Sequence, residues 1–193
     1  MLTIHLGHAR GSLSIAGTET LLDALRTLPG SVQQVLDQNP QIKQAAHTYA
    51  DSDAFFYIGR RTGVPVALES ALKLKEISYD HAEGFPAGEL KHGPLALVTP
   101  DTPVIAILTE HSNPTKTMNN VKEVGSRGAP LIGVTSTPEH AAHLDTTIEV
   151  PSCGPLEPVV GNVALQLFAY HVAEVKDRPI DKPRNLAKSV TVE

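Results

Sequence analysis

Between residues 53 and 176, short apolar runs alternate with stretches in which apolar residues recur at helical spacing. The apolar runs predict buried β-strands at 54–59, 103–109, 130–135 and 146–150. The other stretches predict helices at 64–80, 114–127 and 155–176. Strands that alternate with helices predict a three-layer α/β sandwich, in which helices cover both faces of a parallel sheet. Ligands of such sheets bind at the carboxyl ends of strands, so the loops after Gly59 and Thr109 are candidate binding loops.

The first 50 residues lack strand alternation and favour helices. A helical stripe from Leu21 to Leu28 is expected to end at Pro29-Gly30, a second is expected to end before Pro40, and a third covers 42–49. Residues 1–17, with scattered hydrophobic residues and three glycines, predict little order. We therefore expect three parts: a helical extension from a preceding domain at 1–50, the α/β domain at 51–176 and a C-terminal tail at 177–193.

The charge balance argues against two classes of partner. Sixteen basic and 21 acidic residues give a formal charge of −5, with no long run of either sign, so neither nucleic-acid binding nor membrane-surface binding is expected. No apolar run approaches the roughly 18 residues of a membrane span. The single cysteine, Cys153, cannot form an internal disulfide, which favours a reducing compartment and a cytoplasmic location. Small molecules and protein partners remain.

No motif predicts a metal or a cofactor. The pairs His140/His143 and His5/His8 are close in sequence, but no cysteine or carboxylate framework completes a zinc site beside either pair. The phosphate-binding patterns GxxxxGK[ST] and GxGxxG are absent from the sequence. Cys153 lies in a predicted turn without a base beside it, which favours a structural thiol over a nucleophile.

The densest group of charged residues lies on the helix predicted at 64–80. Glu69, Lys73 and Glu76 follow one another at i, i+4 and i+7, so their side chains share one helical face. A carboxylate that moves a proton between neighbouring carbons needs a nearby cation to stabilise the enediolate that forms between the two transfers. Glu76 and Lys73 supply such a pair. The ordinary alternative is a solvated ion pair worth about 0.3–0.5 kcal/mol.

Two further segments carry candidate chemistry. A short polar segment from Glu89 to Pro94 contains His92, whose imidazole can move protons near neutral pH. The tail after Asp177 holds two prolines that argue against a helix, Pro179 and Pro183. Its apolar residues leave two possibilities open, a disordered end or a segment that docks onto a site.

Two of these segments resemble one known family. The stretches ALESALKLKEISYDHAEGFPAGELKHGPLAL at 67–97 and KPRNLAKSVTVE at 182–193 are similar to the isomerase half of the glucosamine-6-phosphate synthase family, also called glutamine-fructose-6-phosphate aminotransferases. The resemblance runs from about Leu21 to Glu193 and identifies the chain with the second sugar isomerase (SIS) domain and its C-terminal tail. It implies a flavodoxin-like α/β fold, which agrees with the predicted sandwich.

The resemblance also implies residue roles. It makes Glu76 the acid/base that moves a proton between C1 and C2 of the sugar, and Lys73 its cationic partner. It implies that His92 assists ring opening in the active site of the other subunit of a homodimer. Lys188 is implied to contact the open-chain sugar as the tail closes over the site. The further substrate-binding residues that it implies are Ala187 and Glu69.

Departures from the family pattern limit the expected activity. Full-length members begin with a glutaminase domain and a first SIS domain, whereas this chain begins Met1-Leu2-Thr3 without either. The family's phosphate loop lies in that first domain, and the corresponding segment here, 110–117, carries the acidic Glu110. We therefore expect the isolated chain to be inactive in the full conversion of fructose 6-phosphate and glutamine to glucosamine 6-phosphate and glutamate.

The function favoured by the sequence is thus the isomerase-domain portion of this synthase, which performs the ketose-to-aldose step. Its expected partners are fructose 6-phosphate, glucosamine 6-phosphate and a second copy of the chain. One alternative is a non-catalytic SIS module that binds sugar phosphates or regulates a larger synthase. A stand-alone isomerase ranks last, because it would need a phosphate anchor that the sequence does not provide.

Overall fold

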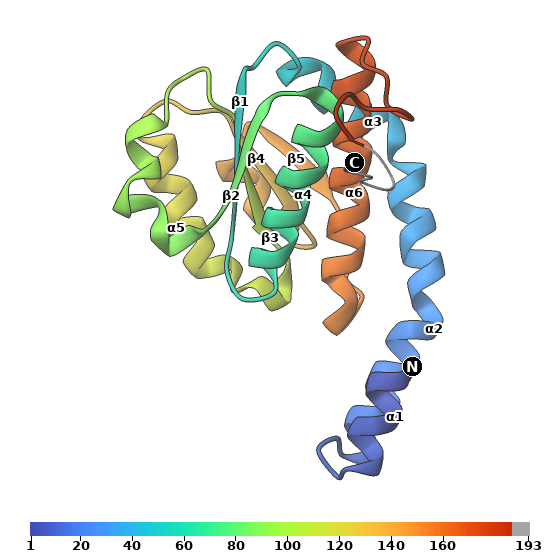
Figure 1. The fold of residues 1–193 in the computed structure, drawn as a ribbon. Coiled ribbons are helices and arrows are strands. Elements are labelled where there is room, and N and C mark those ends of the chain that lie inside the picture. Colours follow the sequence, from blue (N-terminus) through green and yellow to red (C-terminus); the bar gives the residue numbers. More distant parts are fainter. Residues whose placement is uncertain (187–193) are drawn as a thin grey trace, which may run out of the picture.

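A five-stranded parallel sheet forms the centre of the molecule (Figure 1). The computed structural model describes residues 1–186. Neighbouring strands pair in parallel in the order β2-β1-β3-β4-β5. The strand bounds are β1 Ala54–Gly59, β2 His81–Pro86, β3 Val104–Leu108, β4 Leu131–Thr135 and β5 Thr146–Glu149. All four strands predicted from apolar runs are therefore present.

Helices cover both faces of the sheet, which confirms the three-layer α/β fold (Figure 1). Phe55 and Tyr57 of β1 pack into one core, and the alternate residues Phe56 and Ile58 pack into the other. Because both faces are covered, β1 is almost entirely buried. The first core is covered by α2 Ile15–Asp37, α3 Asn39–Tyr49, α4 Gly63–Ser78 and α6 Glu157–Val175; the second is covered by α5 Pro114–Gly125 and the 3-10 segments η1 Ala87–His92 and η2 Pro94–Leu97.

The helix break expected at Pro29-Gly30 is wrong, because α2 continues through Pro29 to Asp37. A proline inside a helix removes one backbone hydrogen bond and crowds the preceding turn. Around it, Leu28 and Val32 pack against the core and Val35 is fully buried. Tertiary packing of this stripe therefore outweighs the local cost of the proline. The break expected before Pro40 does occur, since α3 begins at Asn39.

The disorder expected for residues 1–17 is also wrong. Leu2–Ala9 form the helix α1, and α2 begins at Ile15, where the Ser14 side chain caps it by accepting a hydrogen bond from the Gly17 N–H at 3.0 Å. Helix α1 and the first part of α2 project away from the sheet (Figure 1). No helix within residues 1–186 is both long enough and apolar enough to cross a membrane.

Strand β2 was not predicted, because it lies at the edge of the sheet and only its Ala82 is fully buried. Its sequence, HAEGFP, lacks the apolar run of the central strands. Gly84 is required by close packing, since a Cβ there would lie 2.8 Å from the backbone of Ala67 and Leu68 in α4. The sequence of β2 therefore does not predict a strand, but the strand packs closely against α4.

Candidate functional site

Helix α4 carries Glu69, Lys73 and Glu76 and is positioned by a tight turn after β1. A Cβ on Gly59 would lie 2.3 Å from the Gly63 carbonyl oxygen, so only glycine fits at this turn. From Gly63 the helix runs back along the sheet and ends at Ser78, just before β2 begins at His81. The last turns of α4, which include Glu76, therefore lie at the amino ends of the parallel strands.

The three predicted side chains meet on the outer face of α4. Lys73 Nζ donates a hydrogen bond to Glu76 Oε2 at 2.7 Å and lies 3.8 Å from Glu69 Oε1. The Lys73 and Glu76 side chains are 34% and 29% exposed. The hydrogen bond to Glu76 is the largest cause that raises the pKa of Lys73, and the charges of both glutamates add to it while burial opposes it. Lys73 thus remains a cation beside a carboxylate that solvent and a ligand can reach.

A pocket of about 430 Å³ adjoins this pair. Tyr79 ends α4 in a left-handed conformation, with φ at 69°. Its hydroxyl accepts a hydrogen bond from the backbone N–H of Arg184 at 2.9 Å. The guanidinium carbons of Arg184 and Arg178 lie 4.2 and 5.3 Å from the centre of its ring. The pocket is lined by Leu72, Lys75, Glu76, Tyr79, Arg184, Asn185 and Leu186.

The tail therefore docks beside Glu76, at least as far as Leu186. Asp177 to Leu186 contain no helix, as the two prolines predicted. Sequence analysis did not single out Tyr79, Arg178 or Arg184. The sequence signal for this contact is an aromatic residue near the end of a predicted helix, together with arginines in the polar tail that can stack on its ring. The predicted Ala187 and Lys188 lie outside the described residues.

His92 lies at a different place from Glu76. It is the exposed last residue of η1, which follows the carboxyl end of β2, and Gly93 turns the chain after it with φ at 148°. Glu76 lies at the amino ends of the strands. The structure thus brings Glu69, Lys73 and Glu76 together and places His92 at the opposite end of β2 within one chain.

Two hydroxyl groups that follow β3 form hydrogen bonds with the backbone of their own segment. Ser112 Oγ donates to the carbonyl oxygens of Ile107 and Thr109 at 3.0 and 2.7 Å, and Thr117 Oγ1 donates to Asn113 at 3.1 Å. A phosphate loop would direct such hydroxyls and backbone N–H groups toward the ligand. The Ser112 and Thr117 hydroxyls therefore donate within the chain rather than to a ligand.

Cys153 fits the interpretation of a structural thiol. It is 8% exposed, and burial is the main cause that raises its pKa, with the charge of Glu157 acting in the same direction. A raised pKa keeps the thiol protonated and unreactive near neutral pH.

Comparison with known proteins places these features in a family. The family model described as SIS domain matches residues 48–176. A glutamine-fructose-6-phosphate aminotransferase [isomerizing] of Halobacterium salinarum is 69% identical over all 193 residues, and those of Methanosarcina mazei and Thermus thermophilus are 46% and 44% identical across the whole chain. The chain covers 32% of each of these relatives, so it spans about a third of their length.

Solved structures agree with this comparison. The C-terminal domain of glucosamine-fructose-6-phosphate aminotransferase from Francisella tularensis superposes with a TM-score of 0.87 at 33% identity, over 94% of this chain and 52% of that one. A Clostridium novyi protein described as a putative tagatose-6-phosphate ketose/aldose isomerase reaches a TM-score of 0.74 at 15% identity, over 91% of this chain and 50% of that one, which shows the shared fold only.

Proposed function

This chain belongs to the SIS domain family, and we propose on that basis that it forms the ketose-to-aldose isomerase portion of a glutamine-fructose-6-phosphate aminotransferase. The substrate would be fructose 6-phosphate and the product of the whole enzyme glucosamine 6-phosphate. The observation that carries the proposal is the 2.7 Å hydrogen bond between Lys73 and Glu76 beside an open pocket. The identity to full-length relatives covers the whole chain, which supports the same assignment.

In the proposed reaction, the Glu76 carboxylate removes a proton from C1 of the open-chain sugar and returns it to C2. The electron pair left by the first transfer forms an enediolate, with its charge on the oxygen at C2. Protonation of C2, together with transfer of the C1 hydroxyl proton to the oxygen at C2, then forms the carbonyl at C1. Lys73 is held as a cation at hydrogen-bond distance from Glu76, where it can offset the charge of this intermediate. Glu69 lies 3.8 Å from the same ammonium and would orient it.

The tail and a second chain would complete the site. Tyr79 holds Arg184 next to the pocket, and this contact would direct the predicted residues Ala187 and Lys188 toward the sugar. Because His92 and Glu76 lie at opposite ends of β2 in one chain, a role for His92 in ring opening would require a homodimer in which it reaches the partner's site. We also propose a cytoplasmic location.

Glu76→Gln tests the proton transfer. The chain, in place of the matching third of the Halobacterium salinarum relative, would be assayed for incorporation of solvent deuterium into fructose 6-phosphate. This readout follows proton exchange and does not require glutamine. We expect Glu76→Gln to slow exchange by about 10²–10⁴-fold, the usual contribution of a positioned acid/base, and to leave the fold intact.

Glu19→Gln is the matched control, because Glu19 is an exposed helical carboxylate. Exchange by the Glu76→Gln protein within threefold of the control would refute the role of Glu76. Titration calorimetry of the unmutated hybrid with fructose 6-phosphate addresses the non-catalytic module. A hybrid that binds this sugar phosphate but shows no deuterium exchange would favour that module over the isomerase.

A further inference from the structure

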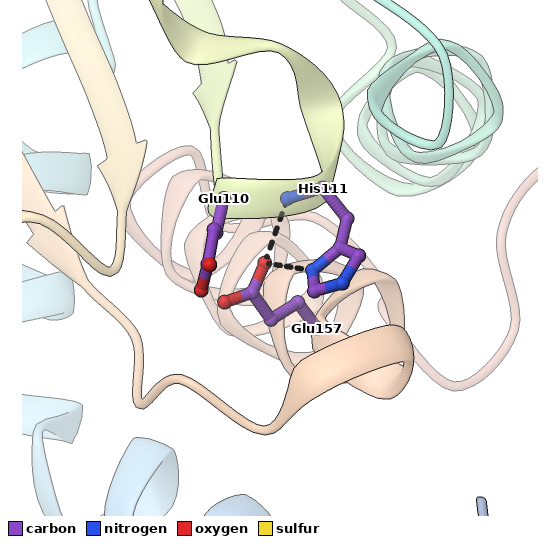
Figure 2. Close-up of side chains that lie close together, drawn as sticks. All are labelled: Glu110, His111 and Glu157. Carbon is purple, nitrogen blue, oxygen red and sulfur yellow. Dashed lines mark hydrogen bonds and ion pairs between the residues drawn. The ribbon is translucent and has the colours of Figure 1, made fainter. Parts of the chain in front are cut away.

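A second cluster of ionisable side chains lies at the other end of the sheet. Glu110 and His111 belong to the 3-10 segment η3 Glu110–Ser112, directly after β3, and Glu157 is the first residue of α6. One ligand atom from each residue can be chosen so that all three atoms lie within 4.8 Å of one another. Figure 2 shows the two carboxylates side by side, with the imidazole on the far side of Glu157.

Glu157 is a fully buried carboxylate without a lysine or arginine partner in residues 1–186. Its side chain is 0% exposed. Its Oε2 accepts a hydrogen bond from the backbone N–H of His111 at 3.3 Å and lies 3.5 Å from the imidazole Nδ1 of the same residue. Its Oε1 accepts a hydrogen bond from the Ser136 hydroxyl at 3.2 Å. A buried carboxylate is costly unless its charge is compensated. The neighbouring Glu110 carboxylate adds to that cost when both are ionised.

One oxygen at the same strand end lacks a hydrogen-bond partner among the described residues. The Thr109 hydroxyl is buried, and no atom of the described residues forms a hydrogen bond with it. Strand alternation places Thr109 on the same side of the sheet as Ile107, which packs in the core that α6 covers. Thr109 directly precedes Glu110. A buried polar group without a partner is rare in folded proteins and calls for a bound water or ligand.

We propose that Glu110, His111 and Glu157 bind one divalent transition-metal ion, of which Zn²⁺ is the probe of choice. One imidazole nitrogen and two carboxylate oxygens are typical ligands of Zn²⁺, at bond lengths of about 2.0–2.2 Å. Such bonds hold ligand atoms about 3.4 Å apart, so the set must tighten. Glu110 is exposed and free to move inward, whereas Glu157 is held by Ser136 and the His111 N–H.

The ion would resolve the electrostatic conflict of the cluster. Two carboxylates and a neutral imidazole around a divalent cation sum to no net charge, and the Ser136 hydroxyl orients Glu157 as groups behind a metal ligand commonly do. His111 is 42% exposed, which leaves solvent access for a fourth ligand such as water. Because the cluster lies at the carboxyl ends of the strands and Glu76 at their amino ends, the two sites are separate within one chain.

Metal binding is tested on the 193-residue chain after treatment with a chelator, by calorimetric titration with Zn²⁺ and by the visible absorption of bound Co²⁺. We expect one equivalent to bind. His111→Gln and Glu157→Gln should each lower the affinity at least about 100-fold, and Ser136→Ala about tenfold. Zn²⁺ should also raise the melting temperature of the unmutated chain, but not that of the His111→Gln chain.

His81→Gln is the matched control, because His81 Nε2 lies 3.5 Å from Glu83 Oε1, the same separation as in the His111–Glu157 pair, but both side chains are exposed. This change should leave affinity unchanged. His111→Gln alters an exposed side chain, so it tests the site even if Glu157→Gln fails to fold. No stoichiometric binding, or equal binding by His111→Gln and the unmutated chain, would overturn the proposal.

Discussion

Two carboxylates of this molecule, Glu76 and Glu157, each lie beside a basic side chain, but Glu76 is partly exposed and Glu157 is buried. Glu76 pairs with Lys73 three positions earlier on one helix, and its side chain is 29% exposed. Glu157 pairs with His111, which is 46 positions away, and it is completely buried. The comparison teaches that helical spacing alone can build a solvent-accessible ion pair, whereas a buried pair requires the whole sheet to close around it.

The two pairs should therefore differ in what they contribute. A partly exposed ion pair adds little to stability, because water screens it and both side chains lose freedom on pairing. A buried carboxylate that accepts two hydrogen bonds leaves unsatisfied donors when it is removed. We expect changes on α4 to affect catalysis and changes at Glu157 to affect folding.

Of three further changes, at Lys73, Glu157 and Tyr79, Lys73→Met gives the largest expected effect. Deuterium exchange in the hybrid enzyme should fall about 10²–10³-fold, because the enediolate loses its cation. The free energy of unfolding should change by less than about 1 kcal/mol. The pKa of Lys73 is raised from 10.5, so the pair stabilises the fold fully below that pH, and this contribution is lost as the pH rises through the raised value.

Urea unfolding of the unmutated and Lys73→Met chains, from neutral pH to above the raised pKa of Lys73, checks the predicted change in stability. The free energies of unfolding of the two chains should converge in strong base. A loss of several kcal/mol at neutral pH with little loss of exchange would reverse the assignment of Lys73 to catalysis.

Glu157→Ala should lower the free energy of unfolding by about 1–3 kcal/mol, because the His111 N–H and the Ser136 hydroxyl lose their acceptor. Urea denaturation with chelator present measures this effect without any metal contribution. Glu76→Ala provides the comparison and should cost less than about 0.5 kcal/mol. Equal costs for the two changes would remove the contrast between the buried and the exposed carboxylate.

The smallest expected effect is at Tyr79. Tyr79→Leu removes both the hydroxyl that accepts from Arg184 and the ring beneath two guanidinium groups, each worth about 0.5–1 kcal/mol. The KM for fructose 6-phosphate in the hybrid should rise about fivefold, since the tail would dock less often. Tyr79→Phe should give a smaller rise. A KM unchanged by Tyr79→Leu would contradict tail anchoring at this residue.

The central part of the fold was predictable because local pattern and burial agree there. The apolar runs of β1, β3 and β4 are almost entirely buried, so each run reports its own strand. In the edge strand β2, which has only one buried residue, this agreement fails, and the strand was missed. In α2, the packing of Val35 and its neighbours overrides the signal of Pro29.

The sequence by itself determined the charged face of α4, because a helix holds residues three and four positions apart next to each other whatever surrounds it. It also determined the parallel sandwich, through the alternation of strand and helix. Only the tertiary structure decided that His92 and Glu76 occupy opposite ends of β2, that Tyr79 holds Arg184, and that Glu157 meets His111. These relations join distant segments, and the packing of helices on the sheet, rather than any local spacing, sets their distances.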